Sequence, residues 1–246
     1  MPGRRAAPAH PRARSGPGVG GSRVTDRVTD NDRPDPYGSL LARVAEIWAG
    51  LAEADPERLA ADTLSSYAPA AGNSGEFRLV VWGRETLVTF PGFAATWVDD
   101  ATTVDPFTAA LLAYYFATCD GTPEAGRWIA FSELRAGTFY AQAFQGYTGN
   151  ELARTFGNDT AAFTSAAVGL SGLPETLADR AFSFRALPLV SVAVACWLGD
   201  EDLGPSYRVL FDAAVGHHLP TDVCAIVGSS LTRRLIAAHG RRSGAG

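Results

Sequence analysis

The sequence contains no lysine: all 21 basic residues of the 246-residue chain are arginine. Without a lysine amine the protein cannot form a Schiff base, anchor pyridoxal phosphate or complete a P-loop, in which lysine reaches the nucleotide phosphates. A glycine-rich phosphate loop and a GxSxG nucleophile elbow are also absent from the sequence. Common nucleotide-binding and α/β-hydrolase functions therefore lose support, and we predict no cofactor.

Cysteine is scarce and long apolar runs are missing. The three cysteines, Cys119, Cys196 and Cys224, form no CxxC pair, so the sequence predicts neither an iron–sulfur cluster nor a structural zinc site. An odd number of scattered thiols favours a reducing compartment, and we expect a cytoplasmic protein. The longest uncharged apolar stretch is residues 187–198. It is about half of the roughly 20 residues that span a bilayer, so no membrane partner is expected.

Charge is divided unevenly along the chain. Residues 1–33 hold seven arginines and three aspartates, whereas the remainder holds 14 arginines and 23 acidic residues, a net charge of −9. An acidic folded part repels phosphate backbones, so we expect no nucleic-acid partner for it. Segment 1–34 is rich in Pro, Gly, Ser and Arg and lacks an apolar face, which predicts a disordered tail. With 46% hydrophobic residues, we expect one domain over 35–240 and a flexible end over 241–246.

Hydrophobic periodicity changes several times along this domain. The expected helices cover 36–54, 55–66, 105–118, 137–146, 149–156, 159–170 and a terminal segment from residue 220. The expected strands cover 77–82, 85–90, 93–98, 127–131, 187–197 and 206–211. Helices before, between and after antiparallel strands indicate an α+β fold. It combines a β meander, a central helical segment, a second β hairpin and a C-terminal helix.

Local signals predict some boundaries more sharply. Asp105 and Pro106 have the residue types of a helix cap and a first helical position. Gly83-Arg84 separates two alternating runs and predicts a hairpin with a type II′ turn, which requires glycine first. The terminal helix has four apolar residues on one face: Val223, Val227, Leu231 and Leu235.

Several linked motifs resemble one protein family. They are GRWIAFSEL at 126–134, FYAQAF at 139–144, ALPL at 186–189, WLGDED at 197–202, VLFD at 209–212 and HHLPTD at 217–222. In this order, over roughly 105–236, the chain resembles the bacterial and archaeal domain of unknown function 3786. The resemblance implies no established activity and no catalytic residue. Some members of that family carry cysteine-rich segments of the iron–sulfur type and come from anaerobes with corrinoid-linked one-carbon metabolism; this chain has no cysteine cluster.

The first candidate site is the acidic loop 199–205, which carries Asp200, Glu201 and Asp202 between glycines. Adjacent residues of a loop point in different directions, so at most two of these carboxylates can converge on one proton or metal ion. The alternative is a solvated turn, for which the loop has the usual composition. An EF-hand is excluded, because its acids alternate and its twelfth residue is glutamate.

The second candidate site comprises Asp212, His217, His218 and Asp222. Two histidines and a carboxylate are ligand types of a divalent metal site, but neighbouring histidines extend in opposite directions. General acid–base work by one histidine and plain structural hydrogen bonding are the alternatives. Because five residues separate the end of one expected strand from these histidines, they and the acidic loop could share one site.

The third candidate site is segment 127–140, with Glu133 beside aromatic residues. Such an environment raises a carboxyl pKa toward neutrality, as proton transfer requires. The alternative is an arginine–glutamate pair that fixes a strand-to-helix corner. Binding residues are expected in this segment and at one strand end: Arg127, Trp128, Arg135, Tyr140 and Trp197.

The cysteines receive less weight. Cys196 lies in an apolar strand and is expected in the core. Cys224 falls in the first turn of the terminal helix, where the helix dipole lowers a thiol pKa. Cys119 follows a helix, and the sequence identifies no base beside any of the three, so a cysteine nucleophile is disfavoured.

These features lead to one hypothesis: a protein that binds an organic small molecule in a cleft between its two β units. It includes the possibility of an enzyme that performs cofactor-independent acid–base chemistry with Glu133 and one of the two histidines. In it, Asp200, Asp202 and Asp222 assist, while Trp128, Tyr140 and Trp197 form apolar walls. The alternatives are a noncatalytic accessory module for a corrinoid-type or other cofactor pathway and a protein-interaction module. No oligomeric state is predicted.

Overall fold

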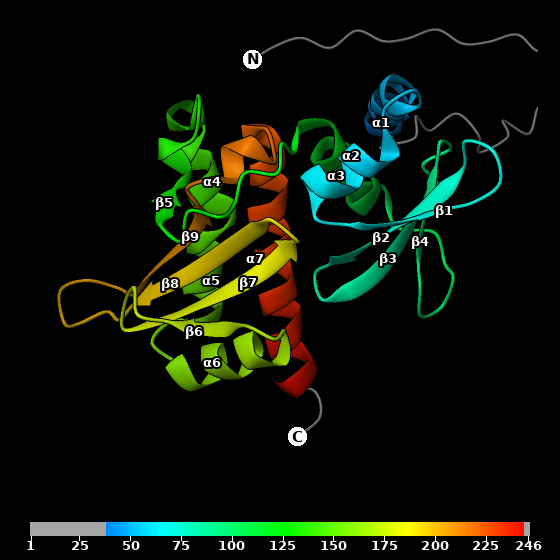
Figure 1. Cartoon of the computed structure of the whole chain (residues 1–246). Helices are drawn as coiled ribbons and strands as arrows, with labels where there is room; N and C mark the ends of the chain where they lie inside the picture. The colour runs from blue at the N-terminus through cyan, green and yellow to red at the C-terminus, as the bar shows by residue number, and fades with distance from the viewer. Residues whose placement is uncertain (1–37, 244–246) are drawn as a thin grey trace, which may run out of the picture. The chain divides into compact units, whose positions relative to one another are not determined.

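The computed structural model describes residues 38–243, which lie in one compact unit. The predicted tail over 1–34 and the last part of the predicted flexible end over 241–246 lie outside the described residues. Helices lie before, between and after the strands of two antiparallel sheets, so the α+β fold predicted from the sequence is confirmed (Figure 1). Of the helices described, none is both long enough and apolar enough to cross a bilayer.

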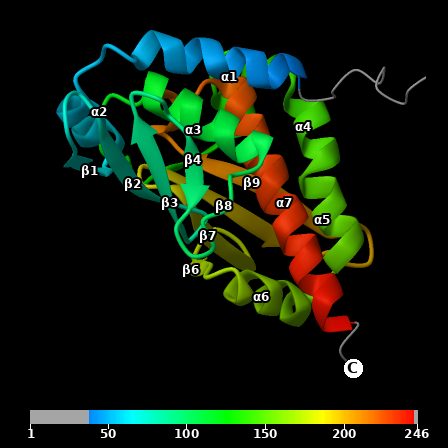
Figure 2. The same cartoon turned by 90° about the vertical axis from the view of Figure 1, so that its right-hand side faces the viewer.

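The first half of this unit forms a four-stranded sheet and three helices. The strands pair in the order β1-β2-β3-β4, and α1 packs across α3 (Figure 2). Their bounds are α1 Gly38–Leu51, α2 Pro56–Thr63, β1 Ser66–Pro69, β2 Gly75–Val81, β3 Arg84–Phe90, β4 Ala95–Trp97 and α3 Pro106–Thr118. As predicted, Asp105 caps α3: its carboxylate accepts the N–H groups of Phe107 and Thr108 at 3.0 and 3.1 Å.

The second half forms a five-stranded antiparallel sheet in the order β5-β9-β8-β7-β6. Helices α5, α6 and α7 lie on one of its faces (Figures 1 and 2). The bounds are β5 Trp128–Ala130, α4 Ala141–Tyr147, α5 Gly149–Phe156, α6 Thr160–Gly169, β6 Leu173–Glu175, β7 Arg180–Leu187, β8 Val190–Trp197, β9 Ser206–Asp212 and α7 Thr221–Ser243; short 3₁₀ turns cover Phe131–Glu133, Gly137–Phe139 and Val215–His217.

The predicted turn of the β2–β3 hairpin was wrong by one residue. Val81 pairs with Arg84, so the turn residues are Trp82 and Gly83. Both have positive φ, 52° and 78°, which is the type I′ turn that matches the twist of the strands. This register keeps Phe77, Leu79 and Val81 on the buried face of the sheet, and a one-residue slip would turn them to the other face.

Three strands were missed in the prediction, and both α1 and α2 end earlier than predicted; the helix expected from residue 137 begins as the 3₁₀ turn Gly137–Phe139, before α4. Helix α2 stops at Thr63 because Leu64 adopts the left-handed conformation, φ 51°, and its N–H bonds back to Ala60 and Ala61. The chain then enters β1. The short edge strand β6 contains proline, and β7 includes Ser183 and two arginines, so neither has a clear alternating pattern.

One hydrophobic core joins the two sheets. Phe77 of β2 and Phe211 of β9 belong to the same cluster of buried side chains. The predicted apolar face of α7 is part of it, since Val223, Val227, Leu231 and Leu235 are each at most 1% exposed. Helix α7 therefore anchors the five-stranded sheet to the rest of the unit.

The close approach of α5 to β9 predicts a contrast between two glycines. A Cβ at Gly149 would collide with the carbonyl oxygen of Tyr207, whereas a Cβ at Gly146 would meet open space. We expect Gly149→Ala to lower the free energy of unfolding by about 1–3 kcal/mol. Gly146→Ala, inside α4, should raise it by about 0.5–1 kcal/mol. Urea unfolding of both variants checks this, and an equal effect of the two would contradict the packing described.

Candidate functional site

The acidic loop is a closed turn. The Asp200 carboxylate accepts the N–H groups of Asp202 and Leu203 at 2.9 and 2.8 Å, and these bonds lower the pKa of Asp200. The Asn158 side chain donates to the Gly199 carbonyl and accepts its N–H. Asp202 is exposed. The loop therefore has the contacts expected of the alternative, a solvated turn. The Asp200 carboxylate binds backbone N–H groups of its own loop and does not share a site with Asp202.

The histidines lie at the opposite end of β9 from this loop. The loop precedes Ser206, and Asp212, which ends the strand, leads into the turn that contains His217. Six residue steps of a strand span roughly 20 Å. The structure therefore does not bring the acidic loop and the histidines into one site.

Asp212 has a structural role. Its carboxylate is 3% exposed and accepts the N–H groups of Ala125, Gly126 and Ala214, each at 2.8 Å. These bonds tie the loop before β5 to the end of β9. Asp222 is exposed at the start of α7, apart from this arrangement. Within residues 38–243, no three His, Cys, Asp or Glu side chains gather closely enough to hold a metal ion.

His217 and His218 make separate contacts. His217 is exposed, and its Nδ1 lies 2.8 Å from Asp120 Oδ2 and 3.3 Å from Thr122 Oγ1. Hydrogen bonds from Thr122 and then His217 hold the pKa of Asp120 below its usual range. His218 is completely buried, and burial lowers its pKa from 6.5. The two adjacent histidines therefore belong to different environments.

The partner of His218 is Cys119, which sequence reasoning did not identify. Its Sγ lies 3.2 Å from His218 Nδ1, although 99 positions separate the residues, and it also contacts the Asp62 carbonyl at 2.9 Å. Burial raises the pKa of the Cys119 thiol. It also raises that of Cys224, so the lowered pKa expected from the helix dipole was wrong. Cys196 is fully buried, as predicted.

Glu133 fixes a corner of the chain, but not through an arginine. Its Oε2 accepts the Ala130 N–H at 2.7 Å and so caps the 3₁₀ turn that follows β5. Among the described residues, neither Arg127 nor Arg135 forms an ion pair with it. The predicted arginine–glutamate pair was wrong, because a backbone N–H occupies the carboxylate.

The predicted aromatic walls lie near a groove of about 350 Å³ between β9 and α4. Tyr140, 69% exposed, immediately precedes Ala141 on its rim. Trp128 is half-buried on β5. Trp197 is partly exposed and carries the guanidinium of Arg208, a groove residue, 5.9 Å from its ring centre. The predicted acid–base residues Glu133, His217 and His218 do not line this groove.

Two further grooves are both lined by Trp82. The larger, of about 300 Å³, is bounded by residues of α3 and α7, including Leu111, Val227 and Arg233. The smaller, of about 130 Å³, is bounded by β2, β7 and α7 and includes Arg185 and Arg234. We call the two together the Trp82 cleft. The sequence analysis assigned none of its residues to a candidate site, and named Asp105, Val227 and Leu231 only for helix capping and packing.

The backbone around Trp82 explains how the cleft forms. The Trp82 N–H donates to the Ala186 carbonyl at 2.9 Å. Ala186 is available because the register of β7 with β8 shifts between Arg185 and Leu187, which leaves it outside the ladder. Such bulges re-aim side chains and are frequent beside functional sites. A bulky residue at positive φ is strained, and such strain is concentrated at functional sites.

Arg234 supplies the charge of the cleft. Its guanidinium lies 5.1 Å from the Trp82 ring centre, and Nε donates weakly to Ser230 Oγ at 3.4 Å. No carboxylate within residues 38–243 forms an ion pair with it. Burial lowers its pKa, and the charge of Asp105 offsets part of that effect. Among the described residues, the contacts of this half-buried guanidinium are therefore a ring face and one hydroxyl group.

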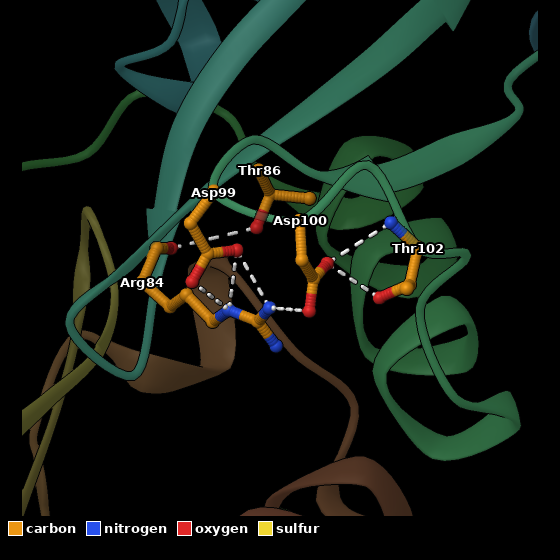
Figure 3. Close-up of polar contacts among 5 residues, drawn as sticks. All are labelled: Arg84, Thr86, Asp99, Asp100 and Thr102. Atoms are coloured by element: carbon orange, nitrogen blue, oxygen red, sulfur yellow. Dashed lines mark hydrogen bonds and ion pairs between the residues drawn. The ribbon is translucent and has the colours of Figure 1, made fainter.

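Arg84 provides the contrast, since it makes the same stacking contact with full charge compensation. Its guanidinium lies 4.3 Å from the Trp97 ring centre. It donates to Asp99 at 2.6–3.0 Å and to Asp100 at 2.7 Å, while Asp100 also accepts from Thr102 (Figure 3). Arg84 therefore holds the loop after β4 in place. Arg234 lacks such partners.

The separation of the acidic loop from the histidines predicts unchanged histidine titrations. We expect Asp200→Asn combined with Asp202→Asn to leave the NMR titration curves of His217 and His218 superimposable on the parent curves. Roughly 20 Å exceeds the screening length of about 8–10 Å at physiological salt. Asp120→Asn is the control that should move the His218 curve, because the charge of Asp120 raises the pKa of His218.

Burial of His218 predicts loss of stability in mild acid. The unfolded chain binds the proton more readily than the folded one, because burial lowers the folded-state pKa from 6.5. The stability contributed by neutral His218 is complete above that value and is lost as the pH falls through the lowered folded-state pKa. Urea unfolding between about pH 8 and about pH 5 should show this decrease. It should be absent in His218→Asn and retained in His217→Asn.

Comparison with known proteins places the chain in a family but assigns no activity. Searches of curated proteins and of solved structures found no match. A family model described as "Domain of unknown function (DUF3786)" matches residues 55–234, which run from the start of α2 to the cleft residue Arg234. The resemblance found in the sequence is thereby confirmed, and the chain belongs to the DUF3786 family.

Proposed function

We propose that the protein binds a small organic anion in the Trp82 cleft. The observation that carries the proposal is the half-buried guanidinium of Arg234, stacked on Trp82 without a carboxylate partner in the described part of the chain. A guanidinium in such a place attracts an anion, and an aromatic face beside it suits a planar ligand. The smaller groove of the cleft includes residues of β2 and β7, one strand from each sheet, which supports the sequence-based hypothesis of a ligand between the two β units.

Charge supports the choice of an anion. The chain beyond residue 33 carries a net charge of −9, yet the cleft gathers Arg233 and Arg234 against Asp105, and its third arginine, Arg185, is paired with Glu124. Asp105 is occupied by the amides that begin α3. A local positive site in an acidic protein favours anions over cations and still opposes a long polyanion such as nucleic acid.

Binding has more support than the acid–base chemistry considered from the sequence. Glu133 caps a turn, and His218 is buried beside Cys119. His217 pairs with Asp120 at the surface. Four grooves within residues 38–243, the Trp82 cleft among them, are lined by none of Glu133, His217 and His218. A binding role without catalysis also agrees with the alternative of an accessory module in a cofactor pathway.

The proposal includes a cytoplasmic location. Cys119, Cys196 and Cys224 are all free thiols and all buried. A protein without disulfides has no need of an oxidising compartment, although its thiols alone do not define one.

The test is the affinity for 2-naphthalenesulfonate, a planar ring with a permanent negative charge. We expect the parent to bind it and Arg234→Gln to bind it about tenfold more weakly, as the loss of one charge-assisted hydrogen bond predicts. Arg208→Gln removes the same charge from an arginine that is stacked on Trp197 outside the cleft, and it should bind like the parent. NMR titration of the indole N–H signals measures all three.

If Arg234→Gln and Arg208→Gln weakened naphthalenesulfonate binding equally, the effect would come from the net charge of the protein and the proposal would be wrong. It would also be wrong if the neutral analogue 2-naphthalenemethanol bound as tightly as the sulfonate, because the cleft would then recognise only the ring.

A further inference from the structure

Two side-chain atoms are buried without a hydrogen-bond partner in the described part of the chain. They are Oε1 of Glu124 and Nε2 of His218. Native proteins keep few such atoms, and each one asks for an explanation. A chain of contacts connects the two. Arg185 binds Glu124 and the Pro188 carbonyl, and the next N–H group, that of Leu189, donates to the Tyr115 hydroxyl. The ring centres of Tyr115 and His218 lie 6.5 Å apart, and the charge of Glu124 acts on the pKa of His218. The occurrence of both atoms in this region indicates one site at which the two side chains act together.

The chemistry of the pair depends on the proton at Cys119. The Cys119 thiol donates to the Asp62 carbonyl, so its sulfur offers lone pairs to His218 Nδ1, 3.2 Å away. The proton of neutral His218 is then assigned to Nδ1, and Nε2 is an acceptor. A carboxylate oxygen is also an acceptor. The two atoms cannot bond to each other until one more proton arrives, and that proton makes Nε2 a donor.

Glu124 also connects this pair to the Trp82 cleft. Its other oxygen, Oε2, binds Nη2 of Arg185 at 2.8 Å. Arg185 lines the smaller groove of the cleft beside Arg234. The Arg185 side chain is 54% exposed and so has room to turn. One carboxylate thus holds a cleft arginine while its second oxygen stays buried without a partner.

We propose that His218 and Glu124 form a proton-binding site that regulates anion binding in the Trp82 cleft, an inference that rests on the function proposed above. A proton on Nε2 of His218 draws the Glu124 carboxylate toward the imidazolium. Nη2 of Arg185 then loses its carboxylate partner and becomes available to the anion beside Arg234, while Nη1 keeps its hydrogen bond to the Pro188 carbonyl. Anion affinity rises as the pH falls.

Other ionisable groups around His218 do not replace Glu124. Tyr115 and Cys119 belong to α3 and its cap, Asp120 follows them, and Asp212 ends β9. Asp120 is held by Thr122 and His217, and Asp212 by three backbone N–H groups. Tyr115 donates to the Thr63 carbonyl. Among these carboxylates, Glu124 has a buried oxygen, Oε1, without a hydrogen-bond partner in the described part of the chain.

The pH range follows from the surroundings. Burial lowers the pKa of His218 from 6.5, while the charges of Asp120, Glu124 and Asp212 raise it in part. The switch therefore operates in mild acid, below the ordinary histidine value.

The probe for the experiment is sulfate, whose charge does not change over this pH range. We expect its dissociation constant for the whole protein to be about tenfold lower at about pH 5.5 than at about pH 7.5, the effect of one added charge-assisted contact. Ionic strength is held constant with chloride. By reciprocity, saturating sulfate should raise the His218 pKa measured by NMR.

Variants separate this inference from the proposed function. Glu124→Gln should bind sulfate tightly at both pH values, because Arg185 is always released. His218→Asn and Arg185→Gln should bind weakly at both, and Arg208→Gln should behave like the parent. If His218→Asn does not fold, Glu124→Gln and the reciprocal NMR shift still decide.

Two outcomes are distinguishable. Sulfate binding that depends on Arg234 but keeps its pH dependence in Glu124→Gln, or shows none in the parent, overturns the proton site and leaves the proposed function standing. Absence of sulfate binding at both pH values, with no weakening of naphthalenesulfonate binding in Arg234→Gln, overturns the proposed function itself.

Discussion

The hydrogen bond from the Trp82 N–H to the Ala186 carbonyl is the joint on which the arrangement of the unit depends. It connects the turn of one sheet to a bulge of the other at 2.9 Å. A bulge leaves a backbone carbonyl outside the ladder, and a buried carbonyl needs a donor. The turn supplies that donor. Once the turn is fixed, the indole lies between α3, β7 and α7, where it lines both grooves of the Trp82 cleft.

Burial decides the ionisation of several groups for which local signals suggest the opposite. Cys224 lies in the first turn of α7, where the dipole favours a thiolate, yet its pKa is raised. Desolvation of a fully buried thiol outweighs the partial charge of one helix end. Burial also raises the pKa of Cys119 and lowers the pKa of His218, so it favours the uncharged form of both side chains. Their contact resembles a nucleophile with its base, but its electrostatics are those of a core hydrogen bond.

Prediction from the sequence succeeded where the signal is local. Asp105 and Pro106 define the start of α3 because a cap needs only the next three residues. The β2–β3 hairpin was found, but its turn was shifted, since Trp at a left-handed position contradicts turn propensity. Strand β7 escaped detection because charge and small residues interrupt its pattern. Propensity describes a residue and its neighbours, whereas these exceptions depend on what packs against them.

The candidate site depends almost entirely on distant contacts. Cys119 and His218 are 99 positions apart, and Arg185 and Glu124 are 61 apart. No spacing rule connects such residues. The sequence placed a cleft between two β units but assigned it to acids and histidines, because those residue types carry chemistry in other proteins. Their hydrogen bonds within this chain explain why most of them are occupied by structure.

The strain at Trp82 is the last link between stability and function. Asparagine, aspartate or glycine would satisfy a type I′ turn without the cost of a bulky side chain at positive φ, roughly 1–3 kcal/mol. The indole contributes packing against the shared core, which offsets part of that cost. The same ring stacks on Arg234, and without it the guanidinium would keep only the weak hydrogen bond to Ser230. The unfavourable turn residue Trp82 and the unpaired Arg234 therefore depend on each other in the proposed binding site. A substitution that stabilised the protein at either position would remove the stacking contact between them.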